Sequence, residues 1–304
     1  MKSLLGIGEC MIELSSISDN IWQQSFAGDV FNTLWYAKAL AKEDVSINFF
    51  TAIGDDQSSK NMLSFIESSG VFCTNIPEIA DTAPGLYKIH LNGAERSFSY
   101  WRDTSAAKQF MQKPELLWSQ ASTADIIYLS GITMAILPDD DAEILIAGLR
   151  SALKPSAIIA FDPNIRPRLW TDKERMKDII SRTAAISDLI LPSFEDEQNT
   201  FEDQTPIATA QRYQSLGAKQ VIVKNSAGDT LFFENNQAEY FPVRRVTDIV
   251  DTTAAGDSFN GAYFAEYLQS GDITKSIGLA QQCSGIVICN KGALIPFETI
   301  QAKI

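Results

Sequence analysis

Residues 251–263 read DTTAAGDSFNGAY, which places two carboxylates six residues apart around a run of small side chains. The apolar spacing that follows them is helical. The small residues 254–256 let the backbone turn tightly, so that N–H groups of a new helix N-terminus point outward beside Asp257. The pattern predicts an anion-binding site at the helix N-terminus, with Asp257 beside it as a candidate general base. Aspartate is also a common first-turn residue, so the stretch alone is equally compatible with a helix cap.

Toward the N-terminus of this stretch, short apolar runs alternate with helical segments. Most runs are continuously apolar, as expected of strands that are buried on both faces. The spacers at 139–153 and 174–185 carry helical apolar spacing, which predicts a βαβα order and a parallel sheet. The runs are LLGIG (4–8), INFFTAIG (47–54), DIIYLSGI (125–132), AIIAFDPN (157–164), DLILPS (188–193) and QVIVKNSAG (220–228).

Polar side chains end several of these runs. Parallel sheets of this kind bind ligands beyond the carboxyl ends of their strands. By position alone, the candidates for a site are therefore Asp162, Asn164, Ser193, Lys224 and Asn225.

One segment breaks the alternation. Residues 85–102, GLYKIHLNGAERSFSYWR, contain two extended runs joined across an Asn-Gly dipeptide, a strong hairpin signal. With a two- or four-residue loop, Tyr87 falls opposite Phe98 or Tyr100. Tyr87, Tyr100 and Arg102 then share one face by the period-two rule. The segment predicts either a lid over a site or an ordinary half-buried hairpin with aromatic pairs.

Composition narrows the class of protein. The chain has 304 residues, 45% of them hydrophobic and 21% charged, which fits one large α/β core with a small appendage. It has no apolar run long enough for a membrane span, and its first residues do not form a signal peptide. A net charge of −13 without Lys/Arg clusters argues against nucleic-acid binding.

The cysteines and the histidine exclude several chemistries. Four scattered cysteines lack CxxC spacing, which indicates a reducing cytoplasm and no zinc site. His90 is the only histidine, which excludes Ser-His-Asp and Cys-His catalysis, and we expect a structural role for it. The motif GIGECM lacks the third glycine of a dinucleotide fingerprint, and no Walker-type loop is present. The acidic run EDEQ at 195–198 fits a solvated helix start or Mg²⁺ organisation equally well.

These motifs together resemble a known family. DTTAAGDSF resembles the C-terminal signature of the ribokinase-like (PfkB) sugar kinases, usually written DTTGAGD, and AGDVFN at 27–32 resembles their N-terminal glycine motif. GECMIELS, PGLY, YWR followed by AAK, LSGI, NIRPRLW and GALIP extend the resemblance along nearly the whole chain. They are similar to the branch of the family formed by the 2-keto-3-deoxygluconate kinases.

The resemblance implies a fold and a reaction. The fold is α/β and ribokinase-like: a single domain, 1–304, with a mostly parallel central sheet flanked by helices and a small β-sheet lid from about 12–32 and 84–104. The reaction is transfer of the γ-phosphate of ATP to O6 of 2-keto-3-deoxygluconate, with ATP and Mg²⁺ as cofactors and a monovalent cation as a further candidate. The family likeness also implies a cytoplasmic homo-oligomer that associates through the lid, with a sugar acid and ATP as its small-molecule partners.

The resemblance also implies roles for individual residues. Asp257 is the base, and the backbone N–H groups of Ala254, Ala255, Gly256 and Asp257 form the anion hole. Sugar hydroxyls are held by Gly28, Asp29 and Asn32, and the carboxylate end by Tyr87, Tyr100, Arg102 and Arg166. The nucleotide-side residues are Asn164, Arg166, Lys224, Ser226 and Gly228. The metal candidates are Glu195 and Asp196, and Asp251 is structural or part of a monovalent-cation loop.

The sequence departs from the family pattern at several positions. Ala254 and Ser226 stand where glycine is usual, and PSFED replaces the Asn-x-x-Glu motif that helps organise Mg²⁺. A methyl group leaves the N–H groups of the anion hole in place, so we expect an active hole unless Ala254 is forced to positive φ. Two other functions stay open: a kinase for a neutral sugar such as fructose or ribose, or for another keto-sugar acid, and a catalytically dead sugar-acid sensor.

Overall fold

The computed structural model describes residues 2–18, 20–92 and 95–304. Within them, a central eight-stranded sheet has the order β14-β13-β12-β11-β10-β9-β1-β4. The strands from β4 to β12 pair in parallel, whereas β13 and β14 pair antiparallel at one edge. The strands of this sheet are β1 (Lys2–Ile7), β4 (Val45–Phe50), β9 (Ile126–Ser130), β10 (Ile158–Asp162), β11 (Leu189–Ile190), β12 (Gln220–Val223), β13 (Thr230–Glu234) and β14 (Gln237–Phe241).

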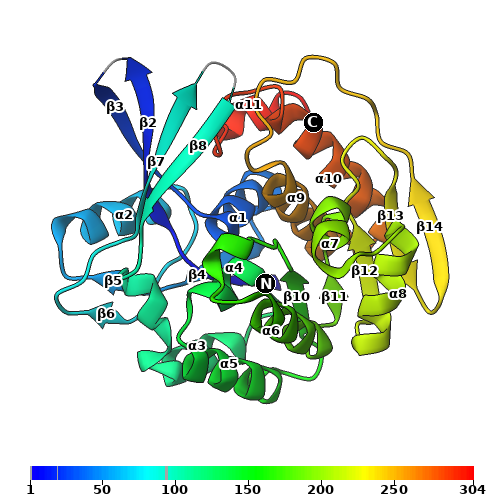
Figure 1. Ribbon diagram of the computed structural model, residues 1–304, viewed down its shortest axis with the longest axis horizontal. Helices are drawn as coiled ribbons and strands as arrows, with labels where there is room; N and C mark the ends of the chain where they lie inside the picture. The colour runs from blue at the N-terminus through cyan, green and yellow to red at the C-terminus, as the bar shows by residue number, and fades with distance from the viewer. Residues whose placement is uncertain (1, 19, 93–94) are drawn as a thin grey trace.

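Helices cover both faces of this sheet (Figure 1). The helices are α1 (Asp29–Leu40), α2 (Gln57–Ser68), α3 (Pro114–Ala121), α4 (Gly131–Ile136), α5 (Asp139–Ala152), α6 (Lys173–Ala185), α7 (Phe194–Phe201), α8 (Pro206–Leu216), α9 (Ala255–Ser270), α10 (Ile273–Val287) and α11 (Phe297–Gln301). Two short 3-10 helices, η1 (Ala106–Gln112) and η2 (Pro167–Leu169), lie in the connections.

Each face of the sheet has its own apolar core, because alternate residues of a strand point to opposite faces. Along β1, Leu4 packs into the core formed with α1, α9 and α10, while Leu5 and Ile7 pack into the core formed with α5, α6 and α8. The continuously apolar runs of the sequence are thus strands buried on both sides, as predicted, and every predicted run contributes a strand to this sheet.

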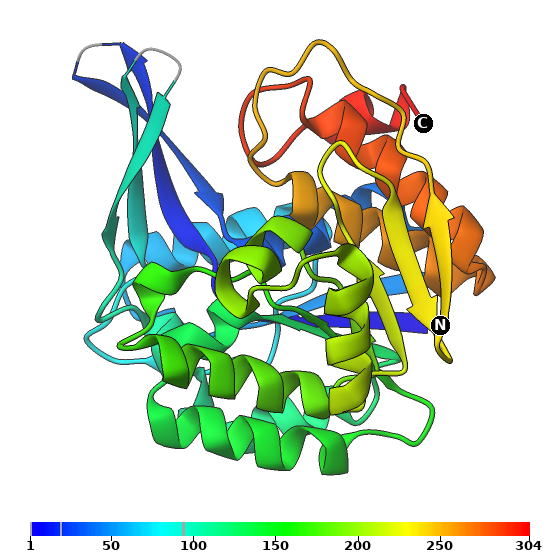
Figure 2. The ribbon, with the colours of Figure 1, turned by 45° about the vertical axis from the view of Figure 1, so that its right-hand side comes forward.

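A second sheet stands away from the body, with the order β3-β2-β7-β8 (Figures 1 and 2). Its strands are β2 (Met11–Ser18), β3 (Ile21–Ala27), β7 (Leu86–Asn92) and β8 (Glu95–Trp101), which lie within the predicted lid segments except for Met11. Tyr87 pairs with Tyr100, one of the two registers expected for the hairpin. Gly93 of the predicted Asn-Gly turn lies outside the described residues. A further pair, β5 (Ile53–Gly54) and β6 (Glu78–Ile79), forms a separate two-stranded parallel sheet.

The expected α/β fold is confirmed, since a mostly parallel central sheet is accompanied by a small separate sheet. This small sheet is here called the lid sheet. No helix in the described parts of the chain is long and apolar enough to cross a membrane. All four cysteines are free. His90 Nε2 and Ser99 Oγ are hydrogen-bonded at 3.0 Å on the lid sheet. This contact is consistent with the structural role expected for His90.

Candidate active site

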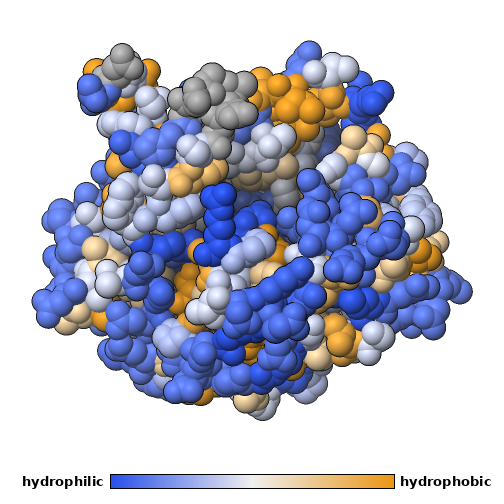
Figure 3. Space-filling model, viewed as in Figure 1, coloured by the Kyte–Doolittle hydropathy of each residue, from blue (hydrophilic) through white to orange (hydrophobic). Residues whose placement is uncertain are grey.

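A cavity of about 750 Å³ lies between the lid sheet and the carboxyl ends of the central strands. Cavities of this size suit small-molecule ligands. The molecular surface is hollowed below the lid sheet, and hydrophilic residues border the hollow (Figure 3). The predicted site residues that line the cavity are Gly28, Asp29, Asn32, Tyr87, Tyr100, Arg102, Asp162, Asn164, Arg166, Ser193, Lys224, Ala254, Ala255, Gly256 and Asp257.

Asp257 lies in the first turn of α9 and faces this cavity. Asn32 donates from Nδ2 to Asp257 Oδ2 at 2.9 Å, which orients the carboxylate. Burial and the nearby carboxylates of Asp29 and Asp162 raise the pKa of Asp257 to about 7, against the opposing effects of Asn32 and Lys224. A carboxylate with such a pKa accepts a proton well near neutral pH, which is the requirement for a general base.

The N-terminus of α9 lies beside this carboxylate. Its first-turn N–H groups have no partner inside the helix. Ala255 N–H donates to Thr252 O at 3.2 Å, so it is engaged in the preceding turn rather than free for an anion. No protein acceptor is found among the described residues for the N–H groups of Gly256 and Asp257. The anion hole expected from residues 254–257 therefore depends chiefly on these two groups.

Ala254 holds a left-handed backbone, with φ 59° and ψ 16°, as the residue that caps α9. From the sequence we expected an active anion hole unless Ala254 had a positive φ, and in the structure its φ is positive. The turn nevertheless forms with alanine: Ser258 N–H donates to Ala254 O at 2.8 Å and closes the first turn of the helix. The methyl group adds backbone strain, and Gly256 and Asp257 still line the cavity.

The sugar-side residues come from the start of α1. A Cβ on Gly28 would approach Glu9 O to 2.2 Å, so only glycine fits at this crossing. Asn164 Nδ2 donates to Asp29 Oδ2 at 2.8 Å. Burial raises the pKa of Asp29, and hydrogen bonds from Ser130 and Asn164 oppose the increase. Asn164, expected near the nucleotide, is therefore hydrogen-bonded to Asp29, which was expected to hold a sugar hydroxyl.

Tyr87 and Tyr100 of the lid sheet are paired on one face, as the period-two spacing predicted, and both line the cavity. The rings of Tyr87 and Tyr100 lie 5.9 Å apart between centroids. The phenol of Tyr87 donates to the buried carboxylate of Glu13. Burial, together with the charge and hydrogen bond of Glu13, raises the pKa of Tyr87 far above its ordinary value. Tyr87 thus serves as a fixed wall, whereas the half-exposed Tyr100 remains open to a ligand.

Arg102 forms a buried ion pair with Glu9. The side chains are 9% and 1% exposed, and Glu9 Oε2 and Arg102 Nε have no hydrogen-bond partner among the described residues. Burial lowers the pKa of Arg102 to about 10. Glu9 offsets the charge that Arg102 was expected to offer a substrate carboxylate. The sequence interpretation missed Glu9, because its stretch was considered as a dinucleotide fingerprint and as part of the family resemblance, and neither indicates a partner for Arg102.

The metal candidates begin α7 and do not line the cavity. Arg166, half exposed, donates from Nη1 to Asp196 Oδ2 at 3.2 Å, and burial raises the pKa of Asp196. Across the described residues, no group of three or more His, Cys, Asp or Glu side chains is arranged to hold a metal ion. Glu195 and Asp196 therefore do not form a dedicated metal cage.

The nucleotide-side residues separate into two groups. Lys224 lines the cavity, whereas Ser226 and Gly228 lie in the turn after β12 and do not. This turn is closed by Gly228 N–H, which donates to Asn225 O at 2.6 Å. Ser226 has φ 45°, again a left-handed backbone at a position where the family pattern has glycine.

Asp251 is buried beneath the site and ties two loops together. Its Oδ1 accepts from Thr253 N–H at 3.0 Å, and its Oδ2 accepts from Gly292 N–H at 2.7 Å. These contacts agree with the structural alternative that the sequence left open for Asp251, since they hold the approach to α9 against the loop after α10.

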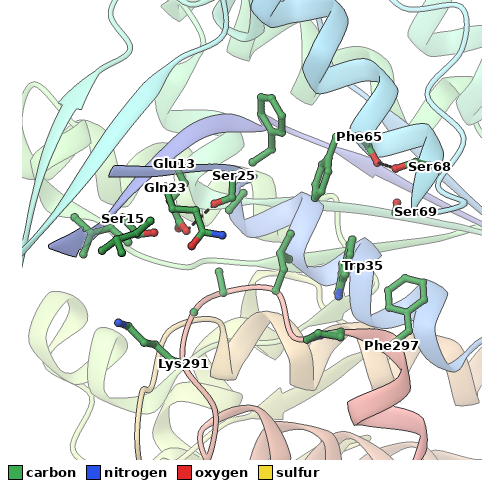
Figure 4. A pocket seen from close by; sticks show the side chains of 18 of the residues that line it. Glu13, Ser15, Gln23, Ser25, Trp35, Phe65, Ser68, Ser69, Lys291 and Phe297 are labelled. Carbon is green, nitrogen blue, oxygen red and sulfur yellow. Dashed lines mark hydrogen bonds between the residues drawn. The ribbon is translucent and has the colours of Figure 1, made fainter. Parts of the chain in front are cut away.

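A second cavity, also of about 750 Å³, lies beside the first, under the outer part of the lid sheet (Figure 4). Ser25 donates to Glu13 at 3.0 Å on its lid side. Trp35, Phe65 and Phe297 form an apolar wall on its body side. This cavity contains none of the predicted site residues.

Comparison with known proteins agrees with this geometry. The family model described as "pfkB family carbohydrate kinase" matches residues 1–300. The chain is 35% identical to 2-dehydro-3-deoxygluconokinase of Haemophilus influenzae, covering 97% of this chain and 96% of that protein. It is 32% identical to 2-dehydro-3-deoxygluconokinase of Escherichia coli, covering 99% of both.

Solved structures show the same fold. A fructokinase with bound ATP from Xylella fastidiosa superposes with a TM-score of 0.81 at 23% identity, covering 99% of this chain and 97% of that chain. Since the family model spans almost every residue and two relatives above 30% identity match along their whole length, the chain belongs to the pfkB family of carbohydrate kinases.

Proposed function

We propose that the protein transfers the γ-phosphate of ATP to O6 of 2-keto-3-deoxygluconate, giving 2-keto-3-deoxy-6-phosphogluconate. The observation that carries this proposal is the similarity, at 32–35% identity, to two enzymes named for this substrate under its alternative name, 2-dehydro-3-deoxygluconate. The position of Asp257 in the cavity supports it, because a base and an anion-binding helix start are the parts that phosphoryl transfer requires.

In this mechanism, Asp257 takes the proton of the sugar hydroxyl as its oxygen attacks the γ-phosphorus. Asn32 holds the carboxylate in place, and the raised pKa suits proton acceptance near neutrality. The N–H groups of Gly256 and Asp257 stabilise charge on the transferring oxygens. Gly28 and Asp29 contact sugar hydroxyls, and Tyr100 and Arg166 border the carboxylate end.

Mg²⁺ is a cofactor that the family implies. This ion commonly binds one or two carboxylates together with substrate phosphates, rather than a cage made only of protein. Asp196 is occupied by Arg166, and the described residues hold no ready cluster. The chain therefore fits a Mg²⁺ that would be held mainly by the nucleotide. Glu195 and Asp196 lie outside the cavity lining, so either would contact the ion through its bound water. When bound, it neutralises charge on the phosphates.

The decisive experiment is an ADP-release assay with a panel of acceptors: 2-keto-3-deoxygluconate, its C4 epimer, gluconate, fructose and ribose. The sugar acid should give the highest kcat/KM, and phosphate should be found at O6 by NMR. Higher kcat/KM for fructose or ribose would replace the proposal with the neutral-sugar kinase. The absence of turnover on every acceptor would favour the sensor.

One observation favours the alternative hypothesis, a kinase for a neutral sugar. Glu9 compensates the charge of Arg102, so this arginine offers less attraction to a carboxylate than its position suggests. Arg166 and Arg168 also line the cavity, and both act on Tyr100 electrostatically. These two cations supply local positive charge for a sugar acid, and Asp196 compensates part of the charge of Arg166 at 3.2 Å.

We also propose that two copies associate through the lid sheet in the cytoplasm. Ile17, Ile21 and Trp101 are 64%, 56% and 59% exposed on this sheet, and the second cavity beside it has an apolar wall. Sedimentation of the parent and of an Ile17→Glu/Ile21→Glu variant tests the association. A dimer that dissociates in the variant supports it, whereas a monomeric parent at micromolar concentration or an intact dimer in the variant contradicts it.

A further inference from the structure

Glu9 and Arg102 lie where the chain passes between the body of the molecule and the lid sheet. Glu9 lies between β1 and β2, and Arg102 directly follows β8. The other two passages lie against them. A Cβ on Gly28, between β3 and α1, would approach Glu9 O to 2.2 Å, and one on Gly85, before β7, would approach Arg102 Cβ to 3.1 Å. The ion pair therefore lies at the base of the lid sheet, so a movement of this sheet would change the geometry of the pair.

The pair makes only one of the two hydrogen bonds that its groups allow. Glu9 Oε1 accepts from Arg102 Nη2. Glu9 Oε2 and Arg102 Nε are both buried and have no hydrogen-bond partner among the described residues. Nε and Nη2 form one edge of the planar guanidinium, and such an edge matches the two oxygens of a carboxylate. The unpartnered acceptor and the unpartnered donor are thus the two atoms that a second, parallel bond would join.

This incomplete pairing is unfavourable in the position of the lid sheet that the structure shows. A buried donor or acceptor without a partner destabilises a protein, and native structures contain few of them. A buried ion pair offsets its desolvation only when its remaining hydrogen bonds are satisfied. The lid sheet stands away from the body (Figure 2). A movement at its base that brings Oε2 to Nε would complete the pair and remove both unsatisfied groups.

The other edge of the guanidinium stays available to a ligand. A guanidinium carries five N–H donors, and two parallel bonds to Glu9 would use the Nε–H and one Nη2–H. The other Nη2–H and the two Nη1–H groups remain. Arg102 lines the cavity, and its guanidinium carbon lies 5.8 Å from the ring centre of the half-exposed Tyr100, which lines the cavity as well. A complete pair with Glu9 would therefore fix the direction in which Arg102 offers its remaining donors.

We propose that Glu9 is a positioning residue for sugar binding. When the lid sheet closes, Glu9 Oε2 accepts from Arg102 Nε, and the complete pair holds the free edge of the guanidinium toward the carboxylate of the sugar acid. The inference rests on the proposed kinase function. No covalent bond changes in this step, and Glu9 stays ionised. The bond gained on closure stabilises the closed lid sheet, so lid position and sugar binding are coupled.

Glu9→Gln tests the second bond alone. The amide oxygen can still accept from Arg102 Nη2, but the amide NH₂ group would face the Nε–H group, and two donors cannot bond. The KM for the sugar acid should rise by about 10-fold, the lower end of the range for a hydrogen bond between charged groups, while kcat changes only a few-fold. If Glu9 acted only as a counter-charge, its removal would strengthen the attraction for an anion and lower this KM. A lower or unchanged KM therefore overturns the inference.

Arg102→Lys separates hydrogen-bond geometry from charge. Lysine keeps a cation beside Glu9 but has no planar fork. In the Arg102→Lys background, Glu9→Gln should therefore raise the KM for the sugar acid by less than about twofold, and an effect as large as in the parent background contradicts the inference. Glu143→Gln is the matched control, because it removes the same charge from the partly exposed pair that Glu143 forms with Arg182 between α5 and α6. Its KM should equal that of the parent.

A measurement on the parent decides the case if thermal unfolding shows that Glu9→Gln does not fold. In NMR spectra of protein with isotope-labelled arginine, the Nε–H signal of Arg102 is the one missing from the Arg102→Lys variant. It should move downfield when the sugar acid is added, because the group gains a carboxylate acceptor. An unmoved signal at saturating sugar acid overturns the inference. Parent activity is measured first, since a parent that phosphorylates no acceptor overturns the proposed function and the inference with it. An active parent with an unmoved signal overturns the inference alone.

Discussion

Ala254 is the residue at which this chain departs most clearly from its family pattern, and its φ of 59° shows the consequence. A left-handed conformation costs an L-residue about 1–2 kcal/mol. Glycine avoids this cost but loses about 0.5–1 kcal/mol through its freer unfolded chain. Ala254→Gly should therefore stabilise the protein by roughly 0.5–1 kcal/mol, raising Tm by about 1–3 °C in thermal unfolding. Ala255→Gly, inside α9, is the control and should lower Tm.

Asp257 is the residue on which the chemistry depends. Asp257→Asn keeps the size of the side chain and removes its ability to accept a proton. Turnover should fall by on the order of 10²–10⁴, while the KM for the sugar changes little. Steady-state kinetics on the folded variant measure both quantities. A variant that turns over within a few-fold of the parent would show that another group is the base.

The pH dependence follows from the same carboxylate. Its pKa of about 7 is raised by burial and by Asp29, and only the ionised form accepts a proton. Below that pH, kcat/KM should fall about tenfold per unit, and above it should level off. Asp29→Asn removes a like charge, so the fall should begin at a lower pH, even if the maximum is smaller. An unmoved midpoint in the kcat/KM profile would contradict this electrostatic account.

The lid sheet is the element that we predict to move when the sugar binds. Its hairpin, β7 and β8, interrupts the βαβ order and places Tyr87 and Tyr100 over the cavity. Closure over a bound sugar would exclude water from the transfer step. Hydrogen exchange of residues 86–92 and 95–102 should slow when the sugar acid is added. The amides of β13 and β14, at the far edge of the central sheet, should not respond. An unchanged hairpin at saturating ligand would contradict closure.

At the scale of the whole molecule, a protein of net charge −13 must attract an anionic substrate. Salt screens charges beyond roughly 8 Å, so the cations that border the cavity decide whether an anionic substrate is attracted to it. A hydrogen bond between charged groups is worth about 10–150-fold, and Glu9 compensates much of the charge of Arg102, so Arg102→Ala should lower kcat/KM for the sugar acid by about 10-fold, the lower end of that range. The value for a neutral ketohexose should stay nearly unchanged. Equal losses on both substrates would mean that Arg102 only supports the lid sheet.

The control for this experiment follows from Glu9, which Arg102→Ala would leave buried without a counter-charge. Glu9→Gln/Arg102→Ala removes both charges, and its Tm shows whether the fold is intact. If the double variant keeps the loss of acid specificity, Arg102 reads the carboxylate. If acid specificity returns, the loss came from the unpaired Glu9.

Much of the molecule was predictable from local patterns. Continuous apolar runs predicted the strands of the central sheet, because a strand covered by helices on both faces must be apolar throughout. Period-two spacing placed Tyr87 and Tyr100 on one face of a hairpin. The edge strand β14 carried no such signal, since it is largely exposed and mixes polar and apolar residues. The neighbouring β13 is buried and apolar, but its short run was not among those predicted as strands.

By itself, the sequence determined the alternation of strands and helices, the helix start with its small residues and aspartate, and the family pattern, because each depends on residues close together in the chain. Only the tertiary structure decided which side chains meet. Asn32 lies 225 residues from Asp257, and Lys224 lies 62 residues from Asp162, yet each pair is hydrogen-bonded. The pairing of Glu9 with Arg102 likewise joins the end of β1 to the end of β8. Such contacts follow from strand order and crossovers, which bring distant strand ends to one edge of the sheet, and no local periodicity encodes them.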